Sequence, residues 1–290
     1  MKDLGPLSYF LGLEISLSSD GHYLTQAKYT FHLISQAGIT DSKILDTPIE
    51  YNNCLNTHDG EPLPDATLYR QLVGSLVYLT VTRLDISYVV HIVSQFMAAP
   101  RSLHYVAVLR ILRYLKGTLF HGLHFSSQSS LTLQAYSDAE RARDPTDRRS
   151  TTGYYFLLGD SLFSWRSKKQ FVIVRSSTEA EYRALADTTA KLLWLRWLFQ
   201  DLGIDCFTAV LIHCDNRSAI QIAHNDVFHE RTKPIEIDCH FVRHHLLQGT
   251  LQLRLVSSQD QLADIFTEPM PPGSFRDLIS KLKLVSLHPT

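Results

Sequence analysis

Four acidic residues, each inside its own distinctive segment, carry the chemistry that this sequence suggests. They are Asp138 in AYSDA, Glu181 in SSTEAEYRALA, Asp215 in LIHCDNRSAI and Asp264 in DQLADIFT. Asp138 and Asp215 stand near the ends of apolar-alternating strands, whereas Glu181 and Asp264 fall in the first turns of helical patterns. Carboxylates gathered on one rim of an α/β domain repel each other strongly unless hard cations lie between them. We therefore expect a site for two Mg²⁺ ions, with Mn²⁺ as the alternative metal, and such a pair supports phosphodiester hydrolysis.

The second half of the chain predicts a scaffold that can bring these residues together. Three strands in succession, LTLQAYSDA, TGYYFLLGD and LFSWRSK, precede a long helix from Ser177 to Leu202 with Ser177 or Thr178 as its N-cap. A strand (AVLIHCD), two helical segments, a further strand (LQLRLVSS) and a final helix from Gln259 complete the region. This order indicates an α/β fold in which an antiparallel set of strands is extended by parallel strands, with helices at its flanks.

The first half predicts a smaller α+β region. A β-hairpin is expected over LSYFLGLEISLSSDGHYLTQ, with its turn at Ser19-Asp20-Gly21, followed by a short helix that closes on Gly38. Helical spacing then extends over roughly Thr67 to Val81, Asp85 to Met97 and Leu103 to Leu119. Because residues 126–130 form a short polar run, we expect domains over residues 1–125 and 131–290.

The bulk composition is that of an ordinary globular protein, with 44% hydrophobic and 20% charged residues and a formal net charge of −1. The cysteines, Cys54, Cys206, Cys214 and Cys239, lack CxxC spacing and indicate reduced thiols. The sequence contains neither a membrane-length apolar run nor a signal-peptide layout at its N-terminus. We therefore expect an intracellular protein, with the compartment left open.

Positive charge is nevertheless concentrated beside the first acidic residue. Between Arg141 and Arg175 there are eight Lys or Arg residues against three Asp residues. A solvated protein face and a nucleic-acid contact surface explain this excess about equally well.

The segments SDAERARDPTDRRSTTGYYFLLGD, FSWRSKKQ, RSSTEAEYRALA, CDNRSAI, HERTKPIEIDCHFVR and DQLADIFT resemble the ribonuclease H domain of Ty1/copia-type retrotransposon Pol polyproteins. The segments MKDLGPLSYFLGLEI, YRQLVGSLVYLTVTRLDISYVV and LRYLKGTLFHGL are similar to the adjoining end of the reverse transcriptase of the same elements. The resemblance covers almost the whole chain. It implies a ribonuclease H-like mixed sheet with flanking helices, preceded by a smaller reverse-transcriptase remnant.

The resemblance also implies roles for individual residues. The family's metal-binding and catalytic carboxylates fall on Asp138, Glu181, Asp215 and Asp264. Glu179 is the alternative to Glu181, but residues two positions apart on a helix point about 200° apart, so only one of them can face the site. The implied reaction is hydrolysis of the RNA strand of an RNA–DNA hybrid. Nucleic-acid contacts are expected to involve the following residues: Arg148, Arg149, Lys168, Lys169, Ser176 and Asn216.

Several features depart from the family pattern. The paired aspartates of the polymerase site are absent, since no Asp-Asp dipeptide occurs, so this chain is not expected to polymerise DNA. Arg141 and Arg143 replace an aromatic residue and a glycine of the family, and Glu268 replaces a lysine. These changes leave a second hypothesis open: a degenerate, non-catalytic Pol fragment that at most binds nucleic acid or other Pol segments.

Two other groups of residues have alternative interpretations. Cys239, His240, His244 and His245 could form a zinc site, but ordinary helix-face histidines are the favoured interpretation because a second ligand pair is not evident. The aromatic residues of the long helix, Trp194, Trp197 and Phe199, are expected in the core rather than in base stacking.

Overall fold

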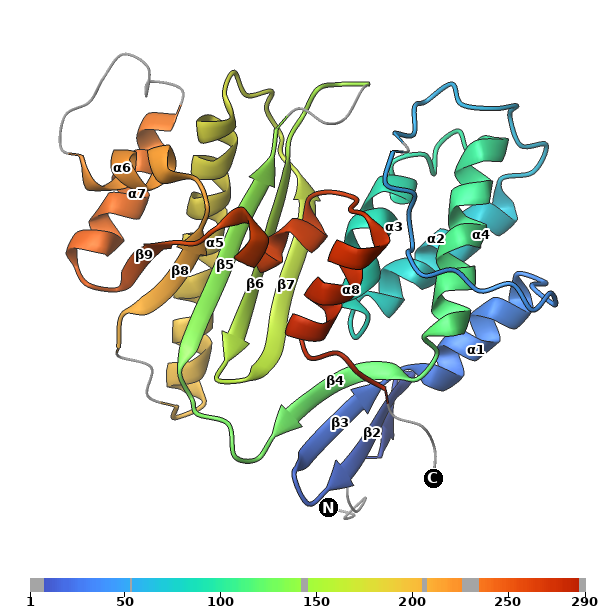
Figure 1. The fold of residues 1–290 in the computed structure, drawn as a ribbon, viewed down its shortest axis with the longest axis horizontal. Coiled ribbons are helices and arrows are strands. Elements are labelled where there is room, and N and C mark those ends of the chain that lie inside the picture. Colours follow the sequence, from blue (N-terminus) through green and yellow to red (C-terminus); the bar gives the residue numbers. More distant parts are fainter. Residues whose placement is uncertain (1–7, 53, 142–145, 205–207, 226–234, 287–290) are drawn as a thin grey trace. The chain divides into compact units, whose positions relative to one another are not determined.

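The computed structural model describes residues 8–52, 54–141, 146–204, 208–225 and 235–286 of the chain. It divides into two compact units (Figure 1). Unit 1 comprises Met1–Ser129 together with Pro269–Thr290, and unit 2 comprises Ser130–Glu268. The first boundary falls in the polar run that the sequence indicates. The last segment, which the sequence suggests for the second domain, belongs instead to unit 1.

The sheet of unit 1 is antiparallel throughout, in the order β1-β2-β3-β4-β10. Its strands are β1 (Tyr9–Phe10), β2 (Leu13–Ser18), β3 (Gly21–Thr25), β4 (His121–Ser126) and β10 (Val285–Ser286). The predicted hairpin is confirmed, since Ser18 pairs with Gly21 and leaves a two-residue turn. Gly21 has a φ of 150°, and an added Cβ would lie 2.1 Å from the carbonyl oxygen of Phe125. Only glycine therefore fits where β3 approaches β4.

Each helix of unit 1 buries apolar residues. The helices are α1 (Ala27–Gln36), α2 (Thr67–Leu79), the short 3₁₀ helix η1 (Leu84–Ile86), α3 (Ser87–Ser94), α4 (Ser102–Gly117) and α8 (Pro272–Lys281). Leu72 and Leu76 on α2 and Leu112 and Leu115 on α4 are fully buried. These positions recur every three or four residues, which is the spacing that predicts the helices from the sequence.

The C-terminal segment joins unit 1 through a strand pairing and a ring contact. Val285 of β10 pairs with Gly122 of β4, and the rings of Phe275 and Tyr114 lie 5.7 Å apart. The single helix expected from Gln259 is wrong. The chain instead forms two 3₁₀ helices, η3 (Ser258–Asp260) and η4 (Leu262–Phe266), before α8 begins. Proline residues at 269, 271 and 272 explain the break, because proline lacks the N–H that an interior helical position donates.

Unit 2 contains a mixed sheet in the order β7-β6-β5-β8-β9. Its strands are β5 (Leu133–Glu140), β6 (Thr151–Leu158), β7 (Ser161–Lys169), β8 (Val210–Cys214) and β9 (Leu251–Leu255). The first three are antiparallel, and β8 and β9 add to β5 in parallel. The predicted ribonuclease H-like mixed sheet, preceded by an α+β part, is therefore confirmed, although unit 1 is not the smaller of the two units.

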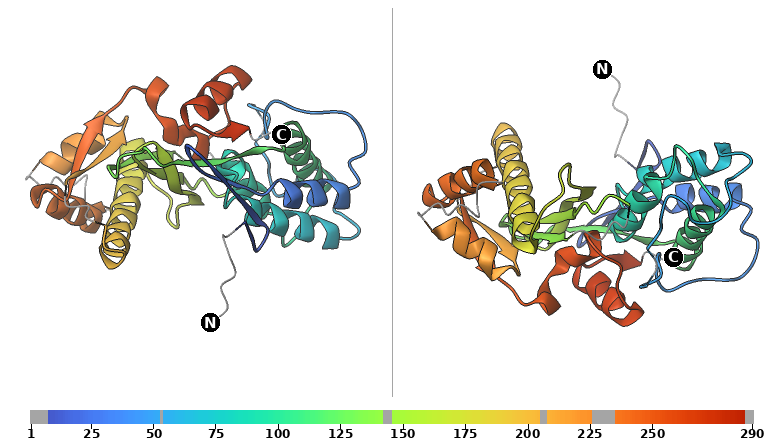
Figure 2. Two further views of the ribbon diagram at one scale, coloured as in Figure 1. Left: turned by 90° about the horizontal axis from the view of Figure 1, so that it is seen from below. Right: turned by 90° about the horizontal axis from the view of Figure 1, so that it is seen from above.

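Helices cover this sheet unequally (Figure 2). The long helix α5 (Ser177–Asp201) lies on one face together with α6 (Arg217–His224) and α7 (Glu236–Leu247), while η4 lies on the other face against β5 and β6. Phe156, Leu185 and Ile212 are fully buried between α5 and the sheet. Within the described ranges, no helix is both long and apolar enough to cross a bilayer.

The core prediction for the aromatic residues of α5 is wrong for two of the three. Phe199 is buried, but Trp194 and Trp197 are 48% and 64% exposed. The buried stripe of this part of the helix runs through Leu192, Leu195 and Phe199, at helical spacing. The two tryptophans lie off that stripe, and the Nζ atom of Lys191 lies 3.7 Å from the ring centroid of Trp194.

Candidate functional site

Asp138 lies near the end of β5, on the central strand of the unit 2 sheet. Alternation along the strand buries Ala135, Ser137 and Ala139 toward α5 and turns Asp138 to the face that η4 covers. The Asp138 residue is only 8% exposed. Its Oδ2 accepts a hydrogen bond from the hydroxyl of Thr267, which follows η4.

Glu181 stands in the second turn of α5, whose N-cap is Ser176 rather than the expected Ser177 or Thr178. Its carboxyl group is buried and lies within the electrostatic reach of Asp138 and Asp215. Glu179 points elsewhere, since its carboxylate accepts a hydrogen bond from the backbone N–H of Arg175 at 2.9 Å and pairs with Arg183 at 3.3 Å. Glu181 is therefore the acidic residue of this helix that faces the other carboxylates.

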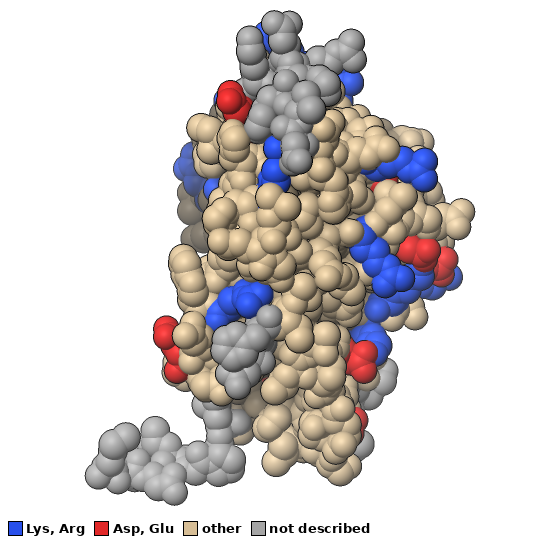
Figure 3. All heavy atoms as spheres, turned by 90° about the vertical axis from the view of Figure 1, so that its left-hand side faces the viewer, with Lys and Arg blue, Asp and Glu red and all other residues tan. Residues whose placement is uncertain are grey.

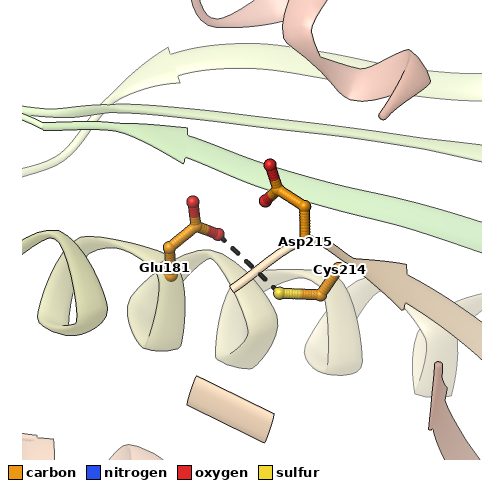
Figure 4. A group of neighbouring side chains, drawn as sticks. All are labelled: Glu181, Cys214 and Asp215. Carbon is orange, nitrogen blue, oxygen red and sulfur yellow. Dashed lines mark hydrogen bonds between the residues drawn. The ribbon is translucent and has the colours of Figure 1, made fainter. Parts of the chain in front are cut away.

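Asp215 follows the last residue of β8 and approaches Glu181 (Figure 4). Their carboxylate oxygens and the Sγ of Cys214 lie within 4.8 Å of one another. Because neighbouring strand residues point to opposite sides, Cys214 is buried in the core while Asp215 is half-buried at the strand end. The Cys214 thiol lies 3.9 Å from Oε2 of Glu181, and Ser258 donates a hydrogen bond to Oδ2 of Asp215 at 2.9 Å.

Asp264 lies on η4, which packs against β5 and β6, and its carboxyl group is close enough to Asp138 and Asp215 for their charges to act on it. Gln261, at the start of this turn, donates a hydrogen bond from Nε2 to the carbonyl oxygen of Ser137 at 2.9 Å. Ser167 on β7 donates to the carbonyl oxygen of Phe266 at 2.6 Å. The short segment that carries Asp264 is thus tied to two strands of the sheet.

The pKa shifts of these groups reflect one crowded, poorly solvated cluster. Burial, with a smaller contribution from the Asp215 carboxylate, raises the pKa of Asp138 to about 6, although the Thr267 hydroxyl opposes the shift. Burial, together with Asp138 and Asp215, raises the pKa of Glu181 well above its ordinary value. Burial raises the pKa of Asp264 to about 9, with added repulsion from Asp138 and Glu268. At neutral pH Asp264 therefore keeps a proton that a binding cation must replace, whereas Asp138 is mostly ionised.

The donor set suits a hard divalent cation. The groups that converge are carboxylate oxygens, which Mg²⁺ and Mn²⁺ prefer as protein ligands. Burial and the nearby Glu181 raise the pKa of the Cys214 thiol, so the sulfur remains protonated and can donate a hydrogen bond to Glu181 rather than bind a metal. Of the four predicted ligands, the carboxylates of Glu181 and Asp215 lie within 4.8 Å of each other.

The six residues expected at nucleic acid are not equivalent. Ser176 Oγ accepts a hydrogen bond from Glu179 N and thereby caps α5, and Asn216 Oδ1 accepts one from Ala219 N and caps α6. Lys169 and Arg149 pair with Asp147 at 3.0 and 3.6 Å. Lys168 lies 4.7 Å above the ring of Phe171. Arg148 is exposed and has a φ of 56° in the loop before β6.

The remaining charged residues leave the surface mixed. Arg141 donates a hydrogen bond from Nη2 to the carbonyl oxygen of Arg175 at 2.8 Å, so its side chain is directed toward the start of α5. Arg143 lies outside the described residues. On the face of the molecule drawn in Figure 3, Lys and Arg lie in separate patches, some inside the face and some at its margins, with acidic residues beside several of them. This face therefore presents no continuous basic stripe.

The zinc alternative finds no support in the described part of the chain. There, the only group of three metal-ligating side chains within reach of one another is Glu181, Cys214 and Asp215. Cys54, Cys214 and Cys239 are free thiols, and Cys206 lies outside the described residues.

Sequence reasoning did not identify Thr267, Gln261 or Cys214 as part of this site. Thr267 and Gln261 each stand three residues from Asp264, and Cys214 precedes Asp215. Proximity in sequence was the available signal, but it does not reveal which side chain turns toward the carboxylates.

No protein-family model matches the chain. It is 42% identical over 290 residues to the retrovirus-related Pol polyprotein from transposon RE2 of Arabidopsis thaliana, covering 100% of this chain and 20% of that polyprotein. It is 34% identical to the corresponding polyprotein from transposon TNT 1-94 of Nicotiana tabacum, covering 99% of this chain and 22% of that polyprotein. The chain thus spans about a fifth of the length of these curated relatives.

Among solved structures, the chain is similar to LC11-RNase H1, which was crystallised in complex with an RNA/DNA hybrid. The match has a TM-score of 0.36 and 15% sequence identity, and it covers 47% of this chain and 94% of that protein.

Proposed function

The chain belongs to the Pol polyproteins of Ty1/copia-type retrotransposons, and on that premise we propose that unit 2 is a ribonuclease H domain that hydrolyses the RNA strand of RNA–DNA hybrids. The observation that carries the proposal is the approach of Glu181 on α5 to Asp215 after β8, within 4.8 Å, with Asp138 on β5 and Asp264 on η4 close enough for their pKa values to respond to the neighbouring carboxylates. A family resemblance alone supports the fold, whereas this convergence supports the chemistry.

Each carboxylate has a distinct position for this task. Asp138 and Asp215 lie at the ends of adjacent parallel strands, so they are the candidates to hold both metal ions. Glu181 approaches from the α5 side and Asp264 from the η4 side, so each is expected to hold one. When bound, two Mg²⁺ ions would supply an activated water and neutralise the charge that develops on the phosphate.

Substrate binding is expected to rest on the backbone and on the 2′-hydroxyls of the RNA strand. Arg148, Lys168 and the Nδ2 amide of Asn216 are the donors that we propose for these contacts. Arg149 and Lys169 add positive charge that Asp147 partly compensates. Ser176 contributes indirectly, because it fixes the start of the helix that carries Glu181.

The test is cleavage of an end-labelled RNA–DNA hybrid by the purified full chain in Mg²⁺ and in Mn²⁺. We expect cuts in the RNA strand only, no cuts in duplex DNA, and loss of cutting in Asp215→Asn. The matched control is Asp201→Asn, an exposed carboxylate at the far end of α5, which should cleave as the parent does. Absence of cleavage by folded protein that still binds the hybrid would instead support a non-catalytic Pol fragment.

A further inference from the structure

Thr267 links two of the four carboxylate positions, although it is not itself acidic. Its hydroxyl donates a hydrogen bond to Oδ2 of Asp138, and its Oγ1 lies 3.2 Å from the backbone carbonyl oxygen of Asp264. The residue is 1% exposed, so water does not compete for these contacts. A hydroxyl has a single hydrogen, and the carboxylate is the stronger of the two acceptors.

On the premise of the proposed nuclease function, we propose that Thr267 is a positioning residue of the metal centre. Its hydroxyl fixes Oδ2 of Asp138 and thereby the orientation of the whole carboxylate. Thr267 itself would contact neither metal nor substrate.

The segment that carries Thr267 is held firmly enough for this role. The Gln261 amide anchors its start to β5, and the Ser167 hydroxyl anchors Phe266 to β7. The backbone N–H of Thr267 donates to the carbonyl oxygen of Asp264 at 3.0 Å. The backbone that carries Thr267 is therefore held in place by contacts that do not involve Asp138.

Close packing against β6 completes the arrangement. Gly153 stands directly opposite Asp138 in the antiparallel register of β5 and β6. A Cβ at this glycine would lie 2.6 Å from Cγ2 of Thr267 and 2.8 Å from Cβ of Phe266. The absence of a side chain at this position lets the Thr267 segment approach β5 closely enough for the hydrogen bond to form.

The hydroxyl and the methyl group of Thr267 therefore have separable roles. The methyl group fills the space over Gly153, whereas the hydroxyl orients Asp138. Valine keeps the shape and removes the hydroxyl, while serine keeps the hydroxyl and removes the methyl group. Residues that orient metal ligands typically change metal affinity about 10- to 100-fold when they are removed.

The experiment measures Mn²⁺ binding to the full chain by titration calorimetry, because this readout does not depend on cleavage. Thr267→Val should weaken Mn²⁺ binding about tenfold, and Thr267→Ser should remain within about twofold of the parent. The control is Thr189→Val, another fully buried threonine of unit 2, whose hydroxyl donates only to the carbonyl oxygen of Leu185 among the contacts described. This control should bind Mn²⁺ as the parent does.

A second readout uses hybrid cleavage. Because Thr267 is buried, Thr267→Val should lower kcat and leave KM for the hybrid unchanged, and Thr267→Ser should retain the kcat of the parent.

The positioning role is wrong if Thr267→Val binds Mn²⁺ as tightly as the parent, or if Thr267→Ser and Thr267→Val lose Mn²⁺ affinity equally. If the proposed nuclease function is wrong, the parent protein should bind Mn²⁺ without cleaving the hybrid. The Mn²⁺ affinities of the parent, Thr267→Val and Thr267→Ser would still test the positioning role of Thr267. A parent that binds no Mn²⁺ overturns both.

Discussion

Arg83 donates two hydrogen bonds to the carboxylate of Asp85, from Nε at 3.0 Å and from Nη2 at 2.7 Å, and both side chains are buried in unit 1. Tyr114 donates to the same carboxylate at 2.6 Å, and Arg83 also donates to the carbonyl oxygen of Thr118. Although burial opposes ionisation, the Arg83 charge holds the pKa of Asp85 below its ordinary value. The network thus keeps both charges paired inside the core.

Asp85→Asn should destabilise unit 1 by about 3–5 kcal/mol, because it leaves a buried guanidinium without its counter-charge. Replacing both partners, as in Arg83→Met with Asp85→Leu, should recover much of this loss. Amide hydrogen exchange of unit 1 is the measurement, since it separates the two units. The control is Arg276→Gln, whose ion pair with Asp46 is 4.0 Å long and exposed, and which should change little. Equal effects of Asp85→Asn and the control would contradict the prediction.

Mg²⁺ should stabilise unit 2 more at about pH 8 than at about pH 5. The raised pKa values of Asp138, Glu181 and Asp264 mean that the metal-free folded state holds protons that the unfolded chain releases near pH 4. The contribution of these groups to stability is therefore present at low pH and is lost as pH rises through about 6 and then about 9. Cations replace the released protons, so metal affinity rises over the same range.

Thermal unfolding with and without Mg²⁺ at the two pH values tests this linkage. The increase in Tm on adding Mg²⁺ should be larger at the higher pH. Asp264→Asn cannot titrate and should flatten the dependence of metal-free stability on pH. An increase that is the same at both pH values would show that these carboxyl groups do not exchange protons for metal.

Local patterns in the sequence predict much of this fold, but they do not predict the contacts between distant segments. The hairpin turn before Gly21 and the strand around Asp138 follow from glycine placement and apolar alternation. Strand β4 was not predicted, since HGLHFS alternates poorly and its partners, β3 and β10, lie about 100 and 160 residues away along the chain. The exposure of Trp194 and Trp197 likewise depends on which face of α5 the sheet covers.

In the candidate site, too, the sequence predicts individual residues but not the contacts between distant segments. The positions of Asp138, Glu181, Asp215 and Asp264 were proposed from motif resemblance, which identifies residue types in order. The hydrogen bond from Thr267 to Asp138 joins residues 129 positions apart. No periodicity or capping pattern encodes such a contact, because it depends on how η4 packs against β5.

Ser176→Ala should destabilise unit 2 by about 1 kcal/mol even without nucleic acid. The reason is that Ser176 Oγ caps α5 by accepting the N–H of Glu179 at 3.1 Å. Ser176→Asp should retain the cap, while placing a negative charge near the hybrid. Chemical denaturation without substrate reports the cap, and hybrid affinity reports any direct contact. If Ser176→Ala left the stability of unit 2 unchanged but strongly reduced hybrid affinity, Ser176 would be a direct contact to the hybrid rather than the cap of α5.

Asp147→Asn should strengthen hybrid binding about two- to fivefold at low salt, because it releases Lys169 and Arg149 from a partly exposed carboxylate. The slope of log affinity against log salt concentration should become steeper by up to about one unit for each of the two side chains, Lys169 and Arg149, that gains a phosphate contact. Anisotropy with a labelled hybrid in the Asp215→Asn background avoids cleavage during the measurement. Asp201→Asn is the control, since this residue lies at the far end of α5. Equal affinity gains in both variants would indicate a general charge effect.

Gly153→Ala should both destabilise unit 2 and weaken Mn²⁺ binding. The added methyl group would lie 2.6 Å from Cγ2 of Thr267 and 3.1 Å from the carbonyl oxygen of Ala263, so η4 must move away from β6. Thr267→Ser removes the closest of these atoms and should recover part of both losses, giving a coupling of about 0.5–3 kcal/mol in a double-mutant cycle. Gly74→Ala on α2 is the control, because its Cβ would meet no described atom within 4 Å and alanine favours a helix. Additive effects of Gly153→Ala and Thr267→Ser would mean that the two positions do not share the space from which Asp138 is oriented.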